Sequence, residues 1–142
     1  MKAIVLAAGE GSRMCKLTQN IPKPLLNING KSIIERQLSS LKQNGILDII
    51  IVIGPHYEKF NFKNVVCVNN LDYKKHDTLG SFMTARDYMN DEIITTYADQ
   101  IFEEKIFNFF FYFFNICHSP NTNFSACKIT FSRTYNIYFS FF

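Results

Sequence analysis

Short apolar runs alternate with polar segments between residues 2 and 98 of the chain. The first run covers residues 2–8 and stops at a glycine, and later runs cover residues 49–53, 65–68 and 93–98. Unbroken runs of this length, bounded by Gly, Asn or Asp, are typical of strands that are buried on both faces of a parallel sheet. The pattern therefore predicts four parallel strands.

Two of the segments between these runs have helical periodicity. Ser32 and Glu35 have the spacing of a capping box, and Gly45 stands where a helix commonly stops. Residues 80–89 predict a second, short helix, whereas two prolines exclude a regular helix from residues 9–24. Between Ser32 and Gly45, apolar residues recur at helical spacing: Ile34, Leu38 and Leu41. The alternation of strands and helices predicts an α/β fold with a mostly parallel sheet.

Ligands of such sheets bind beyond the carboxyl ends of the strands. The four predicted strands are followed by Gly9, Gly54, Asn69 and Asp99. We therefore expect the chemistry of this protein at one edge of the sheet, where these four residues should meet.

Charge and cysteine content disfavour several classes of function. The first 105 residues hold 13 Lys and Arg against 12 Asp and Glu, so no basic patch argues for nucleic-acid binding. The four cysteines form no CxxC pair, which disfavours a structural zinc site. The amino-terminal apolar run is too short for a secretory leader, and we expect a cytoplasmic protein without a membrane span.

The segment from Leu6 to Met14, LAAGEGSRM, carries the most specific signal for chemistry. Small residues that leave a buried strand let backbone N–H groups approach a phosphate, and Arg13 adds a planar cation. Lys23 lies between two prolines and supplies a second, rigidly placed cation. A tight glycine turn with two solvated cations is the alternative, but the combined pattern favours a triphosphate site. The loop matches neither a Walker A motif nor the GxGxxG motif, which disfavours a dinucleotide-dependent oxidoreductase.

Residues 6–14, 17–18 and 22–25 resemble the LAAGxGxRM, LT and PKPL signature of the nucleotidyltransferases, which include sugar-1-phosphate and choline-phosphate nucleotidylyltransferases. The resemblance covers residues 1–107 and implies a Rossmann-like, three-layer nucleotidyltransferase fold. It also implies transfer of a nucleoside monophosphate from an NTP to a phosphorylated acceptor, with release of pyrophosphate. The layout up to Asp99 has no long insertion, which slightly favours CTP and a phosphocholine-like acceptor over a sugar phosphate.

The resemblance further implies roles for single residues. Arg13 and Lys23 would be catalytic residues that bind the phosphates, and Asp99 would bind Mg²⁺, the expected cofactor. Ser81 would cap the second helix, contact the nucleotide, or do both. His76 is expected to be a surface residue in a polar turn. The full set of expected nucleotide-binding residues is Leu6, Ala7, Ala8, Gly9, Gly11, Ser12, Arg13, Lys23 and Ser81.

The chain changes character near residue 105. Residues 106–142 contain no Asp or Glu, and eleven of the fifteen Phe lie there. We expect residues 1–105 to form the nucleotide-binding part of the domain and residues 106–142 to be an atypical tail. The apolar run of this tail is too short for a membrane helix, whereas its aromatic residues suit strands. Phe, Asn, Ile, Tyr and Lys, which are frequent in this tail, are residue types with A/T-rich codons. This composition also suits an out-of-frame translation, the interpretation that we favour.

Two hypotheses for function follow. The first is an Mg²⁺-dependent nucleotidyltransferase. The second is a chain truncated after the metal-binding strand, which would be an inactive nucleotide-binding remnant. The resemblance supports the second hypothesis as well, because it implies that the acceptor site and a further acidic metal ligand belong to a later half of the domain.

Overall fold

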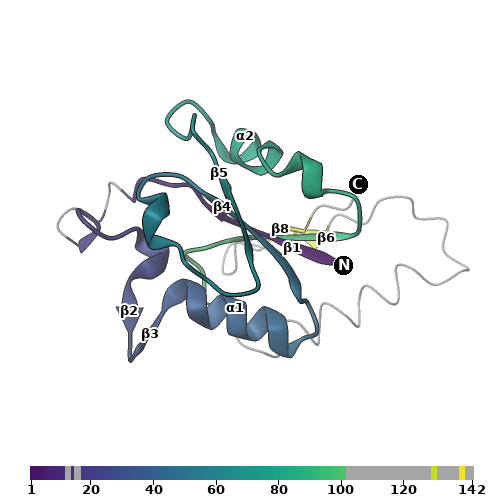
Figure 1. Cartoon of the computed structure of the whole chain (residues 1–142), viewed down its shortest axis with the longest axis horizontal. Coiled ribbons are helices and arrows are strands. Elements are labelled where there is room, and N and C mark those ends of the chain that lie inside the picture. Colours follow the sequence, from purple (N-terminus) through teal and green to yellow (C-terminus); the bar gives the residue numbers. More distant parts are fainter. Residues whose placement is uncertain (12–13, 15–16, 102–128, 131–137, 140–142) are drawn as a thin grey trace, which may run out of the picture.

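Four strands form one sheet in the spatial order β5-β4-β1-β6 (Figure 1). They are β1 (Lys2–Ala7), β4 (Asp48–Ile53), β5 (Val66–Asn69) and β6 (Ile93–Tyr97). Every neighbouring pair is parallel, which confirms the predicted α/β fold and its parallel sheet. The computed structural model describes residues 1–11, 14, 17–101, 129–130 and 138–139.

Two short antiparallel pairs accompany this sheet. β2 (Asn27–Ile28) pairs with β3 (Lys31–Ser32) across an Asn-Gly turn, as the sequence of that turn favours. β7 (Ile129–Thr130) pairs with β8 (Tyr138–Phe139) within the carboxyl-terminal tail. The rest of residues 106–142 lies outside the described residues, so the interpretations of the tail and of the domain boundary stay predictions.

The sheet is the middle of three layers. Val5 packs with Leu38 in an apolar core on one face of the sheet, and the next residue of the strand, Leu6, packs with Phe82 on the other face. Because both faces are covered, the central strands have no polar face, and this explains their unbroken apolar runs. Two helices form the outer layers on opposite sides (Figure 1): α1 (Ile33–Gln43) and α2 (Thr78–Met83).

α1 begins and ends where the sequence predicts. The backbone N–H of Ser32 donates to Oε2 of Glu35 at 2.7 Å, and the N–H of Glu35 donates to Oγ of Ser32 at 3.3 Å, which completes the capping box. Hydrogen bonds from the hydroxyl and then from the backbone of Ser32 hold the pKa of Glu35 below its ordinary value. Gly45 follows the last turn with a φ of +79°, a conformation that glycine adopts without strain.

α2 begins differently from the prediction. Its N-cap is Asp77, whose Oδ1 accepts a hydrogen bond of 2.8 Å from the N–H of Gly80. Ser81 lies inside the helix and does not cap it, so that part of the expectation was wrong. Both residue types are common N-caps, and the extended conformation of Asp77 decides between them.

α2 also ends earlier than predicted, at Met83 rather than Met89. Ala85 departs from helical geometry with a ψ of 13°, and a 3₁₀ turn over Arg86–Tyr88 follows. Phe82 and Ala85 are both buried in the same apolar core. The apolar spacing that predicted one helix is therefore satisfied by two shorter pieces.

The strands meet at their carboxyl edge as predicted. Gly54, after β4, lies so close to the end of β1 that a Cβ there would be 2.6 Å from the carbonyl oxygen of Ala8. The N–H of Ala98 donates to the carbonyl of Leu6 at 2.9 Å, which fixes the chain directly before Asp99. The loops after β1, β4 and β6 are thus held together at one edge.

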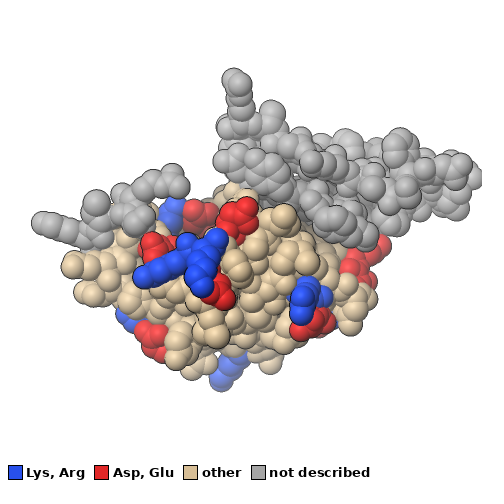
Figure 2. Space-filling view, turned by 90° about the horizontal axis from the view of Figure 1, so that it is seen from above, with Lys and Arg blue, Asp and Glu red and all other residues tan. Residues whose placement is uncertain are grey.

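The surface of the described residues carries mixed charge. Figure 2 shows basic and acidic side chains next to one another on the face that it presents. None of the helices in the described part of the chain is long and apolar enough to cross a membrane.

Candidate active site

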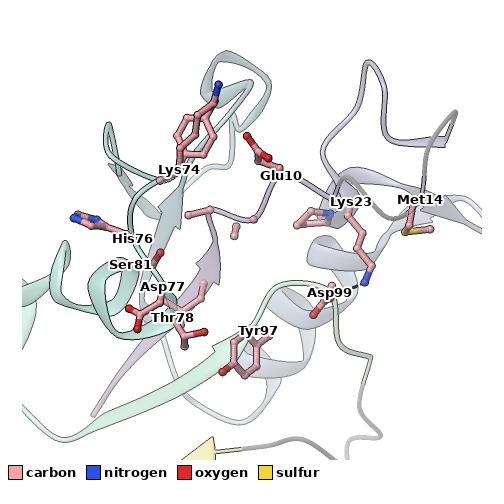
Figure 3. A pocket seen from close by; sticks show the side chains of 17 residues that line it. Glu10, Met14, Lys23, Lys74, His76, Asp77, Thr78, Ser81, Tyr97 and Asp99 are labelled. Carbon is pink, nitrogen blue, oxygen red and sulfur yellow. Dashed lines mark hydrogen bonds and ion pairs between the residues drawn. The ribbon is translucent and has the colours of Figure 1, made fainter.

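A cavity of about 610 Å³ lies at the carboxyl edge of the sheet (Figure 3). It is bordered by the ends of β1 and β6 and by the segment that leads into α2. Ser12 and Arg13 lie outside the described residues, so their roles stay predictions. The predicted site residues that line the cavity are Leu6, Ala7, Ala8, Gly9, Gly11, Lys23, Ser81 and Asp99.

The glycine loop after β1 is closed by a hydrogen bond. Gly11 has a φ of +66°, and its carbonyl accepts a bond of 2.8 Å from Oγ1 of Thr18, a buried residue. A Cβ added at Gly11 would lie 3.6 Å from the Cβ of Lys23, so the loop packs on the stem of that lysine. Thr18 belongs to the LT motif of the sequence, and the structure shows that its hydroxyl holds the loop in place.

Lys23 begins a single 3₁₀ turn that ends at Leu25. The N–H of Leu25 donates to Pro22, and the N–H of Leu26 donates to Lys23, so the turn needs no N–H from either proline. The prolines thus exclude an α-helix here, as predicted, and permit one tight turn. This turn fixes the backbone from which the lysine side chain enters the cavity.

Lys23 and Asp99 form an ion pair inside the site. Nζ of Lys23 lies 2.6 Å from Oδ2 of Asp99, and the two side chains are 35% and 41% exposed (Figure 3). The sequence suggests that Lys23 binds phosphate and that Asp99 binds a metal ion. The structure brings these two side chains into direct contact with each other. Their positions after β1 and β6 explain the contact, because these strands are neighbours in the sheet.

A buried amide organises another wall of the cavity. Asn70, directly after β5, is 1% exposed. Its Nδ2 donates to Oγ of Ser81 at 3.2 Å, and its Oδ1 lies 3.0 Å from Nδ1 of His76. His76 is exposed, as expected, yet it lines the cavity together with Ser81. The only sequence signal for Asn70 is its place next to the end of a strand.

Several lining residues were not among the predicted site residues. Lys74 lies across the cavity from Asp99 in Figure 3, and its Nζ is 6.0 Å from the centre of the Tyr73 ring. Residues 71–76 have neither periodicity nor a motif, so their sequence does not indicate which of them face the cavity. The additional lining residues are Glu10, Met14, Pro24, Tyr73, Lys74, His76, Asp77, Thr78 and Tyr97.

A divalent cation fits this site only together with oxygens of a substrate. Within the residues that the structure describes, no three His, Cys, Asp or Glu side chains come close enough to hold a metal ion. Asp99 offers one carboxylate to the cavity. Mg²⁺ commonly binds through one or two carboxylates plus phosphate oxygens and water. The donor set therefore suits a cation that arrives with a phosphorylated ligand.

Comparison with known proteins agrees with this geometry. Residues 3–111 match the family model of the MobA-like NTP transferase domain. The choline-phosphate cytidylyltransferase of Haemophilus influenzae is 39% identical over 111 residues, which are 75% of this chain and 47% of that protein.

Two solved structures have the same fold. The CTP:phosphocholine cytidylyltransferase of Streptococcus pneumoniae is 34% identical with a TM-score of 0.65, over 73% of this chain and 49% of that one. The inositol-1-phosphate CTP transferase of T. maritima has a TM-score of 0.66 over 99% of this chain and 67% of that one. At 18% identity, the second likeness concerns the fold alone.

These findings confirm the nucleotidyltransferase resemblance and the nucleotidyltransferase fold. The chain spans about half the length of the cytidylyltransferases that it matches. With a glycine loop, a lysine and an aspartate at one sheet edge, and a family match over most of its length, the chain belongs to the MobA-like NTP transferase domain family.

Proposed function

We propose that this domain binds CTP and transfers CMP to a phosphorylated acceptor of the phosphocholine type. One observation carries the proposal: the glycine loop, Lys23 and Asp99 border the same cavity. Backbone N–H groups and a lysine suit a triphosphate, and a carboxylate suits the cation that accompanies it. The names of the relatives from H. influenzae and S. pneumoniae support CTP and phosphocholine as the substrates.

In the proposed reaction, an oxygen of the acceptor phosphate attacks the α-phosphorus of CTP. The new P–O bond forms as the bond to the bridging oxygen of the β-phosphate breaks, and pyrophosphate leaves with that electron pair. The attacking phosphate is already ionised at neutral pH and has little need of a general base. Lys23 and Arg13 would bind phosphate oxygens and offset the charge that develops on the leaving pyrophosphate.

The glycine loop would bring the nucleotide close to the backbone. Among the described residues other than the chain neighbours of Gly9, no atom lies within 4 Å of the position that a Cβ would take at Gly9, so the space next to the loop is open there. Asp99 would hold Mg²⁺, which when bound supplies positive charge to the phosphates. The alignment of the triphosphate would therefore depend on Gly9, Lys23 and Asp99 together.

Ser81 would contact the base. Its Oγ accepts a hydrogen bond from Nδ2 of Asn70, which leaves the hydroxyl hydrogen free to be donated to a ligand. Cytosine offers two acceptors, O2 and N3, on the edge that such a donor would meet. A cytosine base at this wall of the cavity is compatible with such a donor.

The test is pyrophosphate release by the full chain with Mg²⁺, using each of the four NTPs with phosphocholine, 2-aminoethylphosphonate or glucose 1-phosphate. We expect release only with CTP and a phosphocholine-type acceptor. In Asp99→Ala the rate of release should fall by at least about 100-fold. Asp91→Ala is the matched control, because Asp91 pairs with the amino terminus at 2.6 Å and does not line the cavity.

Equal rates in the two variants would contradict the role of Asp99. Release that depends on a sugar phosphate would show that the acceptor is a sugar phosphate and not a phosphocholine-type compound. CTP binding without any release would favour the alternative, a domain that binds nucleotide without catalysing transfer.

A further inference from the structure

The ion pair between Lys23 and Asp99 borders the cavity, and both of its side chains are partly exposed to solvent. Nζ and Oδ2 are 2.6 Å apart, and both side chains line the cavity (Figure 3). The residues are 76 positions apart in the sequence, so only the fold brings them together. In the nucleotide-free protein, each of the two charged side chains is therefore the ion-pair partner of the other.

The proposed function requires different partners for the same two side chains. A triphosphate would take the ammonium of Lys23, and a divalent cation would take the carboxylate of Asp99. An ammonium on Asp99 occupies oxygen lone pairs that a cation needs, and it repels a dication at close range. A metal ion without a nucleotide must therefore compete with the ammonium of Lys23 for the carboxylate of Asp99.

We propose that Lys23 is a positioning residue that occupies the place of the cation on Asp99 until a triphosphate draws it away. A divalent cation then binds well only together with the nucleotide. The inference rests on the proposed function, because it takes Lys23 as a phosphate ligand and Asp99 as the metal ligand. It adds to the proposed function the order in which the ligands bind: the metal ion binds together with the nucleotide and not before it.

The exchange needs only a side-chain movement. Two prolines and one 3₁₀ turn hold the backbone of Lys23. Ala98, which precedes Asp99, is 1% exposed and bonded to Leu6 through its N–H. The long lysine side chain can rotate away from the carboxylate while both backbones stay in place.

Other charged groups of the cavity have different surroundings. Oδ1 of Asp77 accepts a hydrogen bond from Gly80 at the start of α2. Glu10 lines the cavity and is exposed. Lys74 lies across the cavity from Asp99 in Figure 3, next to the ring of Tyr73. Lys74 is therefore a matched control, a second lysine of the same cavity that lies away from the carboxylate.

The experiment measures Mn²⁺ binding to the full chain by electron paramagnetic resonance, with no nucleotide present. We expect Lys23→Met to bind Mn²⁺ about tenfold more tightly than wild type, because it frees the carboxylate and removes a like charge. Lys74→Met removes the same charge from across the cavity and should change the affinity much less. Lys23→Arg keeps the pair and should bind as weakly as wild type.

Equal Mn²⁺ affinity in wild type and Lys23→Met would overturn the inference, and so would an equal increase in Lys74→Met. The double variant Lys23→Met/Asp99→Asn should lose the increase; if it keeps it, the ion binds elsewhere and Asp99 is not the metal ligand. Pyrophosphate release by wild type tests the proposed function separately, because that measurement uses no substitution at Lys23 or Asp99. Circular dichroism of each variant tests whether these substitutions, at partly exposed side chains, leave the fold intact.

Discussion

At the scale of single residues, one wall of the cavity depends on a buried amide. Asn70 is 1% exposed, and its side chain contacts Ser81 of α2 and His76 of the preceding loop. This residue thus ties the loop to the helix and fixes where the hydroxyl of Ser81 points. A buried polar group that loses its partner destabilises a protein by about 1–3 kcal/mol.

We expect Asn70→Ala to lower the free energy of unfolding by about 1–3 kcal/mol, because Ser81 and His76 both lose a partner. CTP affinity should fall as well, since the hydroxyl of Ser81 is no longer oriented. Chemical denaturation and calorimetric titration measure the two effects. Asn90→Ala is the control, because Asn90 is an exposed residue that accepts one hydrogen bond from Lys2 at 2.6 Å. An equal loss of stability in both variants would show that the buried amide has no special role.

At the scale of elements, α1 depends on its capping box. Hydrogen bonds from Ser32 favour the ionised form of Glu35 and hold its pKa below the ordinary 4.5. A carboxyl group whose pKa is lower in the folded state stabilises the fold fully above its unfolded pKa. This stabilisation is lost as the pH falls below 4.5 through the lowered pKa.

Glu35→Gln keeps an oxygen acceptor at the cap but cannot titrate. We expect wild type to be more stable than this variant by about 0.5 kcal/mol at pH 7, a small difference because Glu35 is exposed. The difference should shrink as the pH falls below 4.5. Denaturation curves between pH 7 and pH 3 measure it, and a difference that stays constant over this range would rule out titration of Glu35 as the cause.

The elements also show what a sequence can predict. β1 and β4 end within one residue of their predicted bounds, because burial on both faces leaves an unbroken apolar run. α1 carries a cap signal at each end. α2 was less predictable, because Asp77 and Ser81 are both N-cap residue types and periodicity does not show that the chain leaves α-helical geometry at Ala85.

The site was predictable to a different extent. The glycine loop, Lys23 and Asp99 were predicted as site residues from a local motif and the ends of strands, and the structure places them around one cavity. The contact between Lys23 and Asp99 was not predicted, because it depends on β1 and β6 being neighbours. The role of Asn70 likewise depends on a loop and a helix that meet only in the folded chain.

At the scale of the whole molecule, the order of the strands sets the form of the cavity. β1 lies between β4 and β6, so its glycine loop lies in the middle of the carboxyl edge. Asp99 follows β6 at one side of the sheet, whereas Asn70 follows β5 at the other. The cavity thus has an ion pair on one side and a network of hydrogen bonds on the other.

The central claim is that this cavity is the nucleotide site, and calorimetric titration of CTP with Mg²⁺ into wild type and Gly9→Val tests it most directly. In the part of the chain that the structure describes, no atom beyond the chain neighbours of Gly9 lies within 4 Å of a Cβ added there. Valine should therefore leave the melting temperature unchanged while it fills space beside the ligand. We expect wild type to bind CTP and the folded variant to bind it at least about tenfold more weakly, which is a loss of about 1.4 kcal/mol or more. Equal CTP affinity in the two folded proteins would contradict the claim.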